Sequence, residues 1–122
     1  MQDIVYVEPS ARYSQATIHN GIAYLAGQVA AGPGKDFENQ AAQILGQIDA
    51  LLARCGSDRS RVLTVNIYLK DLSDLSAFNL LWDAWVTPDR LPTRLPIEAK
   101  LAASAYLLEI QVVATLRSPK SD

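Results

Sequence analysis

The sequence of 122 residues predicts an α+β fold, a two-layer sandwich in which two helices cover one face of a mixed β-sheet. Two observations carry this prediction. Apolar residues recur with the period of a helix in two segments, and they alternate with polar residues, as in half-buried strands, in the segments around them. A chain of this length buries one core, so residues 1–122 are expected to form a single domain.

A β-hairpin is predicted near the N-terminus, after a short first strand at Ile4–Val7. The segments Thr17–His19 and Ile22–Ala26 flank the dipeptide Asn20–Gly21. Asn-Gly readily adopts the positive φ angles of a two-residue turn, so these segments are expected to pair. His19 is then an exposed turn residue without a catalytic role.

The longer helix is predicted from about Asp36 to Cys55. Apolar residues recur there at helical spacing: Phe37, Ala41, Ile44, Leu45, Ile48, Leu51, Leu52 and Cys55. Asp36 is the expected N-cap, and Gly56 stands where a left-handed residue is preferred. Cys55 is expected to be a buried residue that fills space in the core. Because it is the single cysteine, no internal disulfide or thiolate cluster can form.

A strand and a second helix follow. Leu63, Val65, Ile67 and Leu69 alternate with polar residues, which predicts a half-buried strand. Ser73 is the expected N-cap of a helix that ends before Pro88. The apolar stripe of this helix comprises Leu75, Phe78, Trp82 and Trp85.

Two final strands, over residues 94–101 and 107–116, are expected to form an antiparallel hairpin with their apolar faces turned to the helices. This register places Lys100 opposite Glu109, whereas a shift by two would set like charges against each other. It also places Glu98 opposite Gln111. Leu95 and Ile97 would then face the helices.

In the same register Arg94 and Glu109 share the other face, six ladder steps and about 20 Å apart. They can therefore serve one site only if a second subunit brings them together. The mixed polar and apolar face that carries them is a candidate for subunit contact.

Composition excludes several classes of function. A net charge of −2 with interspersed acids and bases gives no basic footprint for nucleic acid. The apolar runs are too short to span a bilayer, and the N-terminus does not resemble a signal peptide. With His19 as the single histidine, a multi-histidine zinc site is impossible. We expect a cytoplasmic protein with a short frayed tail over residues 117–122.

The pattern Pro92-Thr93-Arg94-x-x-Ile97-Glu98-Ala99-Lys100, followed by Leu108-Glu109-Ile110, resembles the signature of the reactive-intermediate (imine) deaminase family, also called RidA/YjgF-like. Weaker matches are Arg12–Ala16, Tyr24–Val29, Asn66–Asp71 and Phe78-Asn79 with Trp82. The resemblance covers roughly Ser10 to Leu116. It implies a chorismate-mutase-like fold of the bacillus type and a homotrimer, in which three sheets form a central barrel with ligand clefts between neighbouring subunits.

The resemblance also implies an activity. Family members hydrolyse enamine and imine intermediates of the 2-iminobutanoate and 2-iminopropanoate type to 2-keto acids and ammonia. These small carboxylate-bearing compounds arise from pyridoxal-phosphate dehydratases. The deaminase itself needs no cofactor and no metal.

Arg94 matches the family's carboxylate-binding arginine. A guanidinium suits this role because it meets a carboxylate with two hydrogen bonds. A solvated surface arginine is the alternative. Glu109 matches the glutamate that positions or polarises a water at the imine carbon, and apolar neighbours could raise its pKa. The alternative for Glu109 is a cross-strand ion pair with Lys100.

Tyr13, Gly27 and Trp85 are further candidates for binding the substrate. Tyr13 matches a tyrosine near the family's cleft, although a core or interface role remains open. Gly27 would allow close approach of the backbone and offer an amide donor, or it is simply a glycine at a strand end. Trp85 either shapes the cleft or belongs to the core.

Pro96 and Ala26 depart from the family pattern. Pro96 stands where a cysteine commonly offers its backbone N–H to the ligand carboxylate, and proline has no N–H. Ala26 stands where many active members have serine. These two residues favour an alternative function, a non-catalytic trimeric binder of small carboxylic acids or a related hydrolase. A purely structural or interaction protein is a third hypothesis, and only the mixed polar and apolar sheet face supports it.

Overall fold

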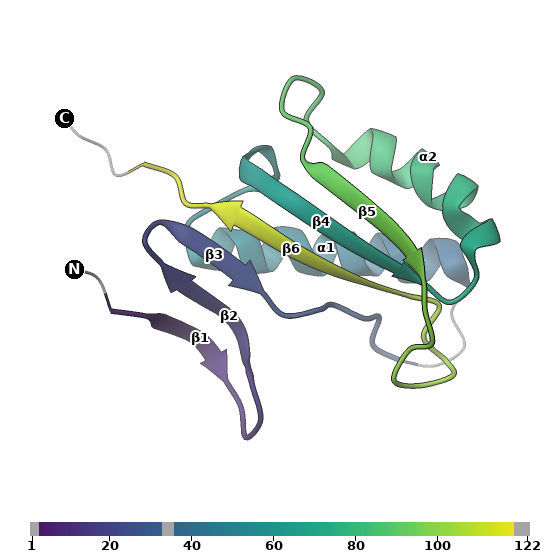
Figure 1. Cartoon of the computed structure of the whole chain (residues 1–122), viewed down its shortest axis with the longest axis horizontal. Coiled ribbons are helices and arrows are strands. Elements are labelled where there is room, and N and C mark those ends of the chain that lie inside the picture. The colour runs from purple at the N-terminus through teal and green to yellow at the C-terminus, as the bar shows by residue number, and fades with distance from the viewer. Residues whose placement is uncertain (1–2, 33–35, 119–122) are drawn as a thin grey trace.

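The structure is a computed structural model and describes residues 3–32 and 36–118. Two helices, α1 (Phe37–Cys55) and α2 (Leu75–Trp85), lie on one face of a six-stranded sheet, as Figure 1 shows. Two 3-10 turns, η1 (Arg59–Arg61) and η2 (Leu72–Asp74), precede β4 and α2. The strands are β1 (Val5–Pro9), β2 (Ser14–His19), β3 (Ile22–Leu25), β4 (Val62–Leu69), β5 (Thr93–Glu98) and β6 (Leu108–Thr115). The predicted α+β class is confirmed; of the expected tail, residues 119–122 lie outside the described residues.

The N-terminal hairpin forms as predicted, but His19 is the last residue of β2 and is half-buried rather than an exposed turn residue. His19 pairs with Ile22 across the turn, where Asn20 and Gly21 have φ angles of 52° and 78°. These positive angles match the right-handed twist of the flanking strands. β1 extends the hairpin by pairing antiparallel with β2.

Helix α1 also has the predicted ends. The carboxylate of Asp36 accepts the N–H of Asn39 at 2.9 Å, and Gly56 ends the helix with a φ of 82°. Its apolar stripe is buried against α2 and against β2, β3 and β6. Burial raises the pKa of the Cys55 thiol, although the positive charge of Arg54 acts to lower it. The raised pKa fits a neutral residue that fills space in the core.

The start of α2 differs from the prediction. Residues 72–74 form the turn η2, so Ser73 precedes the helix and does not cap it. The carboxylate of Asp71 accepts the backbone N–H of Ser73 at 2.9 Å and its hydroxyl at 2.7 Å. Phe78 and Trp82 are buried as expected.

A bulge at the start of β4 corrects the predicted position of Leu63. Val62 pairs with Ala114 and Thr64 pairs with Val113, so the residue between them is left over. An extra residue changes the alternation of faces locally. Leu63 is therefore 42% exposed and not part of the core.

The predicted hairpin of the last two strands is wrong. β5 pairs in parallel with β4, while β6 lies between β3 and β4 and is antiparallel to both. Glu109 thus faces Tyr68 rather than Lys100, and Glu98 faces Leu69 rather than Gln111. A helix between two strands returns the chain to the same end of the sheet, and this makes β4 and β5 parallel.

The same topology reverses the predicted faces of β5. Arg94 is aligned with the buried Val65 and points to the helices. Leu95 and Ile97 lie on the opposite, helix-free face and are 52% and 37% exposed. We call this surface the open face of the sheet. One row of residues crosses it through all six strands: Tyr6, Thr17, Tyr24, Val113, Thr64 and Thr93.

None of the helices in the described part of the chain is long and apolar enough to cross a membrane.

Phe78→Ala is expected to lower the free energy of unfolding by about 3–5 kcal/mol, because it leaves a cavity in the core. Phe78 is fully buried in α2, where its ring contacts Trp82 at a centroid distance of 5.9 Å. Urea denaturation at a fixed protein concentration measures the change. Leu80→Ala on the same helix is the matched control, because Leu80 is 76% exposed, and it should change stability by less than about 0.5 kcal/mol.

Candidate functional site

Glu109 lies on the open face of the sheet, against the backbone of Gly27. It alternates along β6 with the buried residues Leu108 and Ile110. A Cβ added to Gly27 would overlap the carboxylate of Glu109 and lie 3.0 Å from its Cδ. Glycine alone leaves room for this carboxylate. The structure therefore brings together two predicted site residues, Gly27 and Glu109.

Backbone hydrogen bonds hold the segment 26–28 in this position. The N–H of Gln28 donates to the carbonyl of Ile110 at 2.8 Å, and the N–H of Ile110 donates back at 3.1 Å. On the other side, the N–H of Ala26 donates to the carbonyl of Gln15 at 2.8 Å. Gly27 is thus fixed between β2 and β6.

A chain of glutamine side chains supports the same segment from below. Gln43 donates to Gln47 at 2.9 Å, and Gln47 donates to Gln28 at 3.3 Å. Gln28 donates in turn to Gln15 at 3.3 Å and to the carbonyl of Ala26 at 3.0 Å. Gln28 is only 8% exposed, so each of these bonds also avoids an unpaired buried amide. The four glutamines link helix α1 to strand β2.

This glutamine chain was not predicted from the sequence. Gln43 and Gln47 lie one helical turn apart on α1, which is the signal that could have found the first link. The other links join residues far apart in the sequence and leave no local pattern. The glutamine chain borders a recess of about 210 Å³. Arg54 and Glu8 form an exposed ion pair at the rim of this recess.

Arg94 is held against helix α2. Its Nη1 donates to the Asn79 side chain at 2.7 Å, and its guanidinium carbon lies 5.3 Å from the centroid of the Trp82 ring. Asn79 and Trp82 are three residues apart on α2 and so share a face. Within residues 3–32 and 36–118, the guanidinium makes no other hydrogen bond or ion pair.

This arrangement orients Arg94 rather than leaving it solvated. The ring of Trp82 restricts the guanidinium plane, and the Asn79 amide oxygen fixes one of its nitrogens. The other N–H groups remain available to an anion. Asn79 belongs to one of the weaker sequence matches to the family. The structure shows that its side chain holds Arg94.

Arg94 and Glu109 do not meet within one chain. They point to opposite faces of the sheet and lie on opposite sides of β4. Arg94 is aligned with Val65 and Glu109 with Tyr68, so they are three positions and two strand spacings apart. This corresponds to about 14 Å between their Cα atoms. The distance of about 20 Å expected from a hairpin was wrong, but the conclusion that one chain does not join them holds.

Pro96 lies on the free edge of the sheet. The N–H of Ala99 donates to the carbonyl of Leu69 at 2.9 Å. By the two-residue period of a strand, Leu95 and Ile97 also direct their N–H groups to β4. Pro96 occupies a position whose N–H would point away from the sheet, where proline is tolerated.

Tyr13 lies in the turn between β1 and β2 and is 57% exposed. Its carbonyl accepts the N–H of Ser10 at 2.8 Å and the Ser10 hydroxyl at 2.9 Å. These bonds fix the turn and leave the phenol ring in solvent. Tyr13 is therefore not a core residue of this chain.

Trp85 belongs to the core, as the alternative allowed. It is 6% exposed, and its indole N–H donates to Asp49 at 3.1 Å. Arg59 covers its ring at 5.3 Å and donates to Asp49 at 2.6 Å. Trp85 contacts Trp82 at a centroid distance of 5.7 Å, and the Trp82 ring lies next to Arg94.

Four of the recesses in the described surface have volumes of about 210–310 Å³, and neither Arg94 nor Glu109 lines any of these four. Glu109 is partly exposed on the open face, and Arg94 is half-buried beside helix α2. Among the described residues, no group of three histidine, cysteine or carboxylate side chains could hold a metal ion.

Comparison with known proteins identifies the family. The family model described as "Endoribonuclease L-PSP" matches residues 4–116. A RutC family protein of Haemophilus ducreyi is 40% identical over 113 residues, which cover 93% of this chain and 97% of that protein. A RutC family protein of Haemophilus influenzae is 44% identical over 111 residues, covering 88% and 93% of the two chains.

Solved structures agree. A member of the YjgF protein family from Neisseria meningitidis, NMB1025, superposes with a TM-score of 0.92 at 42% identity, covering 95% of this chain and 97% of that one. A protein from Entamoeba histolytica described as a putative endoribonuclease L-PSP superposes with a TM-score of 0.83 at 28% identity. The family model, the sequence relatives and the solved structures agree. The chain belongs to the RutC/YjgF family, which the RidA/YjgF-like signature around Arg94 and Glu109 predicted.

Proposed function

We propose that this protein is an imine deaminase that hydrolyses reactive enamine and imine intermediates to 2-keto acids and ammonia. The substrates would be small carboxylate-bearing imines of the 2-iminobutanoate and 2-iminopropanoate type, released in the cytoplasm by pyridoxal-phosphate dehydratases. The observation that carries the proposal is the pre-oriented guanidinium of Arg94, held by Asn79 and Trp82 with its remaining N–H groups unengaged among the described residues.

In this proposal Arg94 binds the substrate carboxylate. A bidentate pair fixes both the position and the plane of the carboxylate, and thereby the direction in which the adjacent imine carbon is approached. Asn79 and Trp82 reduce the freedom that Arg94 would otherwise lose on binding.

Glu109 would position the hydrolytic water. The water oxygen bonds to the imine carbon, and the carboxylate takes a proton from the water and returns it to the nitrogen. The resulting carbinolamine loses ammonia and leaves the carbonyl of the 2-keto acid. The overall balance is one imine and one water to one 2-keto acid and one ammonia. Contact with Gly27 supports this role, because it limits the positions that the carboxylate can adopt.

A complete site would require two subunits of a homotrimer. Arg94 lies on the helix side of the edge strand β5, whereas Glu109 lies against Gly27 on the open face and the exposed ring of Tyr13 belongs to the turn between β1 and β2. Apolar side chains on the open face, among them Tyr24, Leu95 and Ile97, support burial of this face against neighbouring copies. A closed arrangement of three chains would give three equal sites.

A non-catalytic binder of small carboxylic acids is the second candidate. Pro96 offers no N–H at the free edge beside Arg94, and Ala26 offers no hydroxyl beside Gly27. Each missing donor to a charged ligand would lower binding by about 1.5–3 kcal/mol. Arg94 could still hold a carboxylate under these conditions.

The description "Endoribonuclease L-PSP" names a different activity for relatives of this chain. Binding of RNA depends on neutralising phosphates with lysine and arginine. With 11 basic and 13 acidic residues, this chain offers RNA little electrostatic attraction. We therefore favour the deaminase.

A coupled assay tests the proposal. A threonine dehydratase generates the imine, and the purified protein should accelerate release of the 2-keto acid. Arg94→Ala should abolish the acceleration, while Arg117→Ala should retain it, because Arg117 pairs with Asp58 on the surface. If the wild-type protein fails to accelerate release but binds 2-keto acids through Arg94, it is the carboxylate binder instead.

Mixing two inactive variants tests whether the site is shared. Arg94→Ala and Glu109→Gln should each be inactive, yet a refolded equimolar mixture should recover about one quarter of the wild-type activity, because about one interface in four then combines an intact Arg94 with an intact Glu109. The coupled assay measures this recovery. A mixture no more active than its separate components would show that subunits do not share the site.

Gly27→Ala should lower kcat at least about tenfold with a smaller effect on KM, because the new Cβ displaces the Glu109 carboxylate and leaves Arg94 intact. Gly46→Ala in helix α1 is the matched control, since a Cβ there meets nothing within 4 Å. This control should keep full activity and raise stability by about 0.5–1 kcal/mol. Equal losses in the two variants would remove the argument for a specific contact with Glu109.

A further inference from the structure

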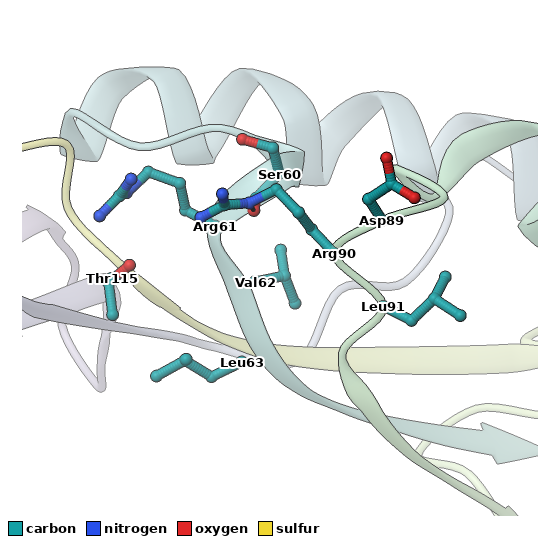
Figure 2. Close-up of a pocket in the computed structure, with 8 residues that line it drawn as sticks. All are labelled: Ser60, Arg61, Val62, Leu63, Asp89, Arg90, Leu91 and Thr115. Carbon is teal, nitrogen blue, oxygen red and sulfur yellow. Dashed lines mark hydrogen bonds between the residues drawn. The ribbon is translucent and has the colours of Figure 1, made fainter.

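A second candidate binding site lies away from Arg94 and Glu109, in a recess of about 290 Å³ (Figure 2). Four segments border it: η1, the start of β4, the residues 89–91 before β5, and the end of β6. Its lining comprises Ser60, Arg61, Val62, Leu63, Asp89, Arg90, Leu91 and Thr115. The volume is enough for a small organic molecule.

Two arginines of this recess are oriented but not neutralised. The Nε–H of Arg61 donates to the carbonyl of Leu116 at 3.0 Å, and the Nε–H of Arg90 donates to the carbonyl of Ser60 at 2.7 Å. Each bond holds its guanidinium group by the Nε–H alone. Over the described ranges 3–32 and 36–118, the Nη groups of both arginines have no partner.

Neighbouring arginines differ in this respect. Arg59 pairs with Asp49 and Arg117 pairs with Asp58, so their charges are compensated within the chain. Arg61 has no such carboxylate partner among the described residues. Two guanidinium groups that are held by neutral carbonyls and line one recess are suited to an external anion.

Leucine side chains give the recess an apolar part. Leu63 is 42% exposed and Leu91 is 65% exposed. Leu63 is turned outward by the bulge between Val62 and Thr64. Bulges often re-aim a side chain next to a functional site. Figure 2 shows the two side chains extending in opposite directions, with Leu63 on the same side of the recess as Arg61. A ligand with a short apolar group could cover Leu63 while its charged group meets the arginines.

Asp89 limits the charge of the ligand. It lines the same recess, and Figure 2 shows its carboxylate on the side away from Arg61. Two cations and one anion leave a net charge of +1, which one negative charge compensates. A multiply charged anion such as phosphate would be repelled by Asp89.

We propose that this recess binds a small organic monocarboxylate, with its carboxylate on Arg61 and Arg90 and its aliphatic group on Leu63. This site is separate from the proposed deaminase site. It does not depend on catalysis, and both kinds of ligand carry a carboxylate. Its test must therefore remove Arg94 first.

Isothermal titration calorimetry of the Arg94→Ala protein with sodium hexanoate tests the proposal. We expect binding to one site per chain, reduced at least about tenfold by the double substitution Arg61→Gln/Arg90→Gln. Arg12→Gln, at an exposed arginine outside the recess, should leave it unchanged. Absence of hexanoate binding, or binding unaffected by the double substitution, would overturn the proposal.

Two further variants keep the test valid if loss of the arginines disturbs folding. Leu63→Ser should weaken hexanoate binding several-fold and leave acetate binding unchanged, because only hexanoate is long enough to reach this leucine. Asp89→Asn should strengthen hexanoate binding and should bring inorganic phosphate into measurable range. Weaker hexanoate binding in Asp89→Asn, or equal effects of Leu63→Ser on both carboxylates, would contradict the assigned orientation. Failure of these titrations leaves the deaminase proposal unaffected, because Arg94 is absent throughout.

Discussion

The structure depends on the insertion of β6 between β3 and β4. This last strand joins the N-terminal hairpin to the β4–α2–β5 unit, and it is hydrogen-bonded on both sides. Because β6 occupies this position, β5 is confined to the edge and Glu109 comes to lie in the middle of the open face. The separation of Arg94 and Glu109 onto opposite faces follows from the same arrangement.

Polar groups near Gly27 form a second organising feature. Helix α1 could have packed on the sheet through apolar contacts alone, yet Gln47 and Gln28 place amides at this contact. Buried amides are stable only in a restricted set of geometries, so they select one position of the helix relative to segment 26–28. The same segment adjoins Glu109 through the Gln28–Ile110 bridge. Packing of the helix and placement of the carboxylate are thereby coupled.

Features fixed by neighbouring residues could be predicted from the sequence. The Asn20–Gly21 turn and the caps of α1 involve residues that are adjacent or one helical turn apart. Pairing of the last strands could not be predicted in this way, because apolar alternation is equally compatible with several partners. The helical segment between β4 and β5 indicates a parallel crossover, and this signal was outweighed by the proximity of β5 and β6 in sequence. The bulge at Leu63 has no local signature.

The candidate site shows the same division. Arg94, Glu109 and Gly27 were identified by their motif, and the contact of Gly27 with Glu109 fits that choice. Asn79 and the glutamine chain were missed, because their role lies in contacts between distant segments. Trp85 was one of the predicted ligand contacts, but its spacing on an apolar stripe indicated the core, where it lies.

Pro96 has a consequence beyond the chemistry of the site. A strand at the edge of a sheet presents a row of N–H and carbonyl groups that can recruit further strands without limit. Proline interrupts that row on β5 at the point where an incoming strand would need a donor. The edge can therefore meet a neighbour through side chains and a few hydrogen bonds, but it is a poor template for continuous strand addition. Pro96 thus protects the protein against edge-to-edge aggregation.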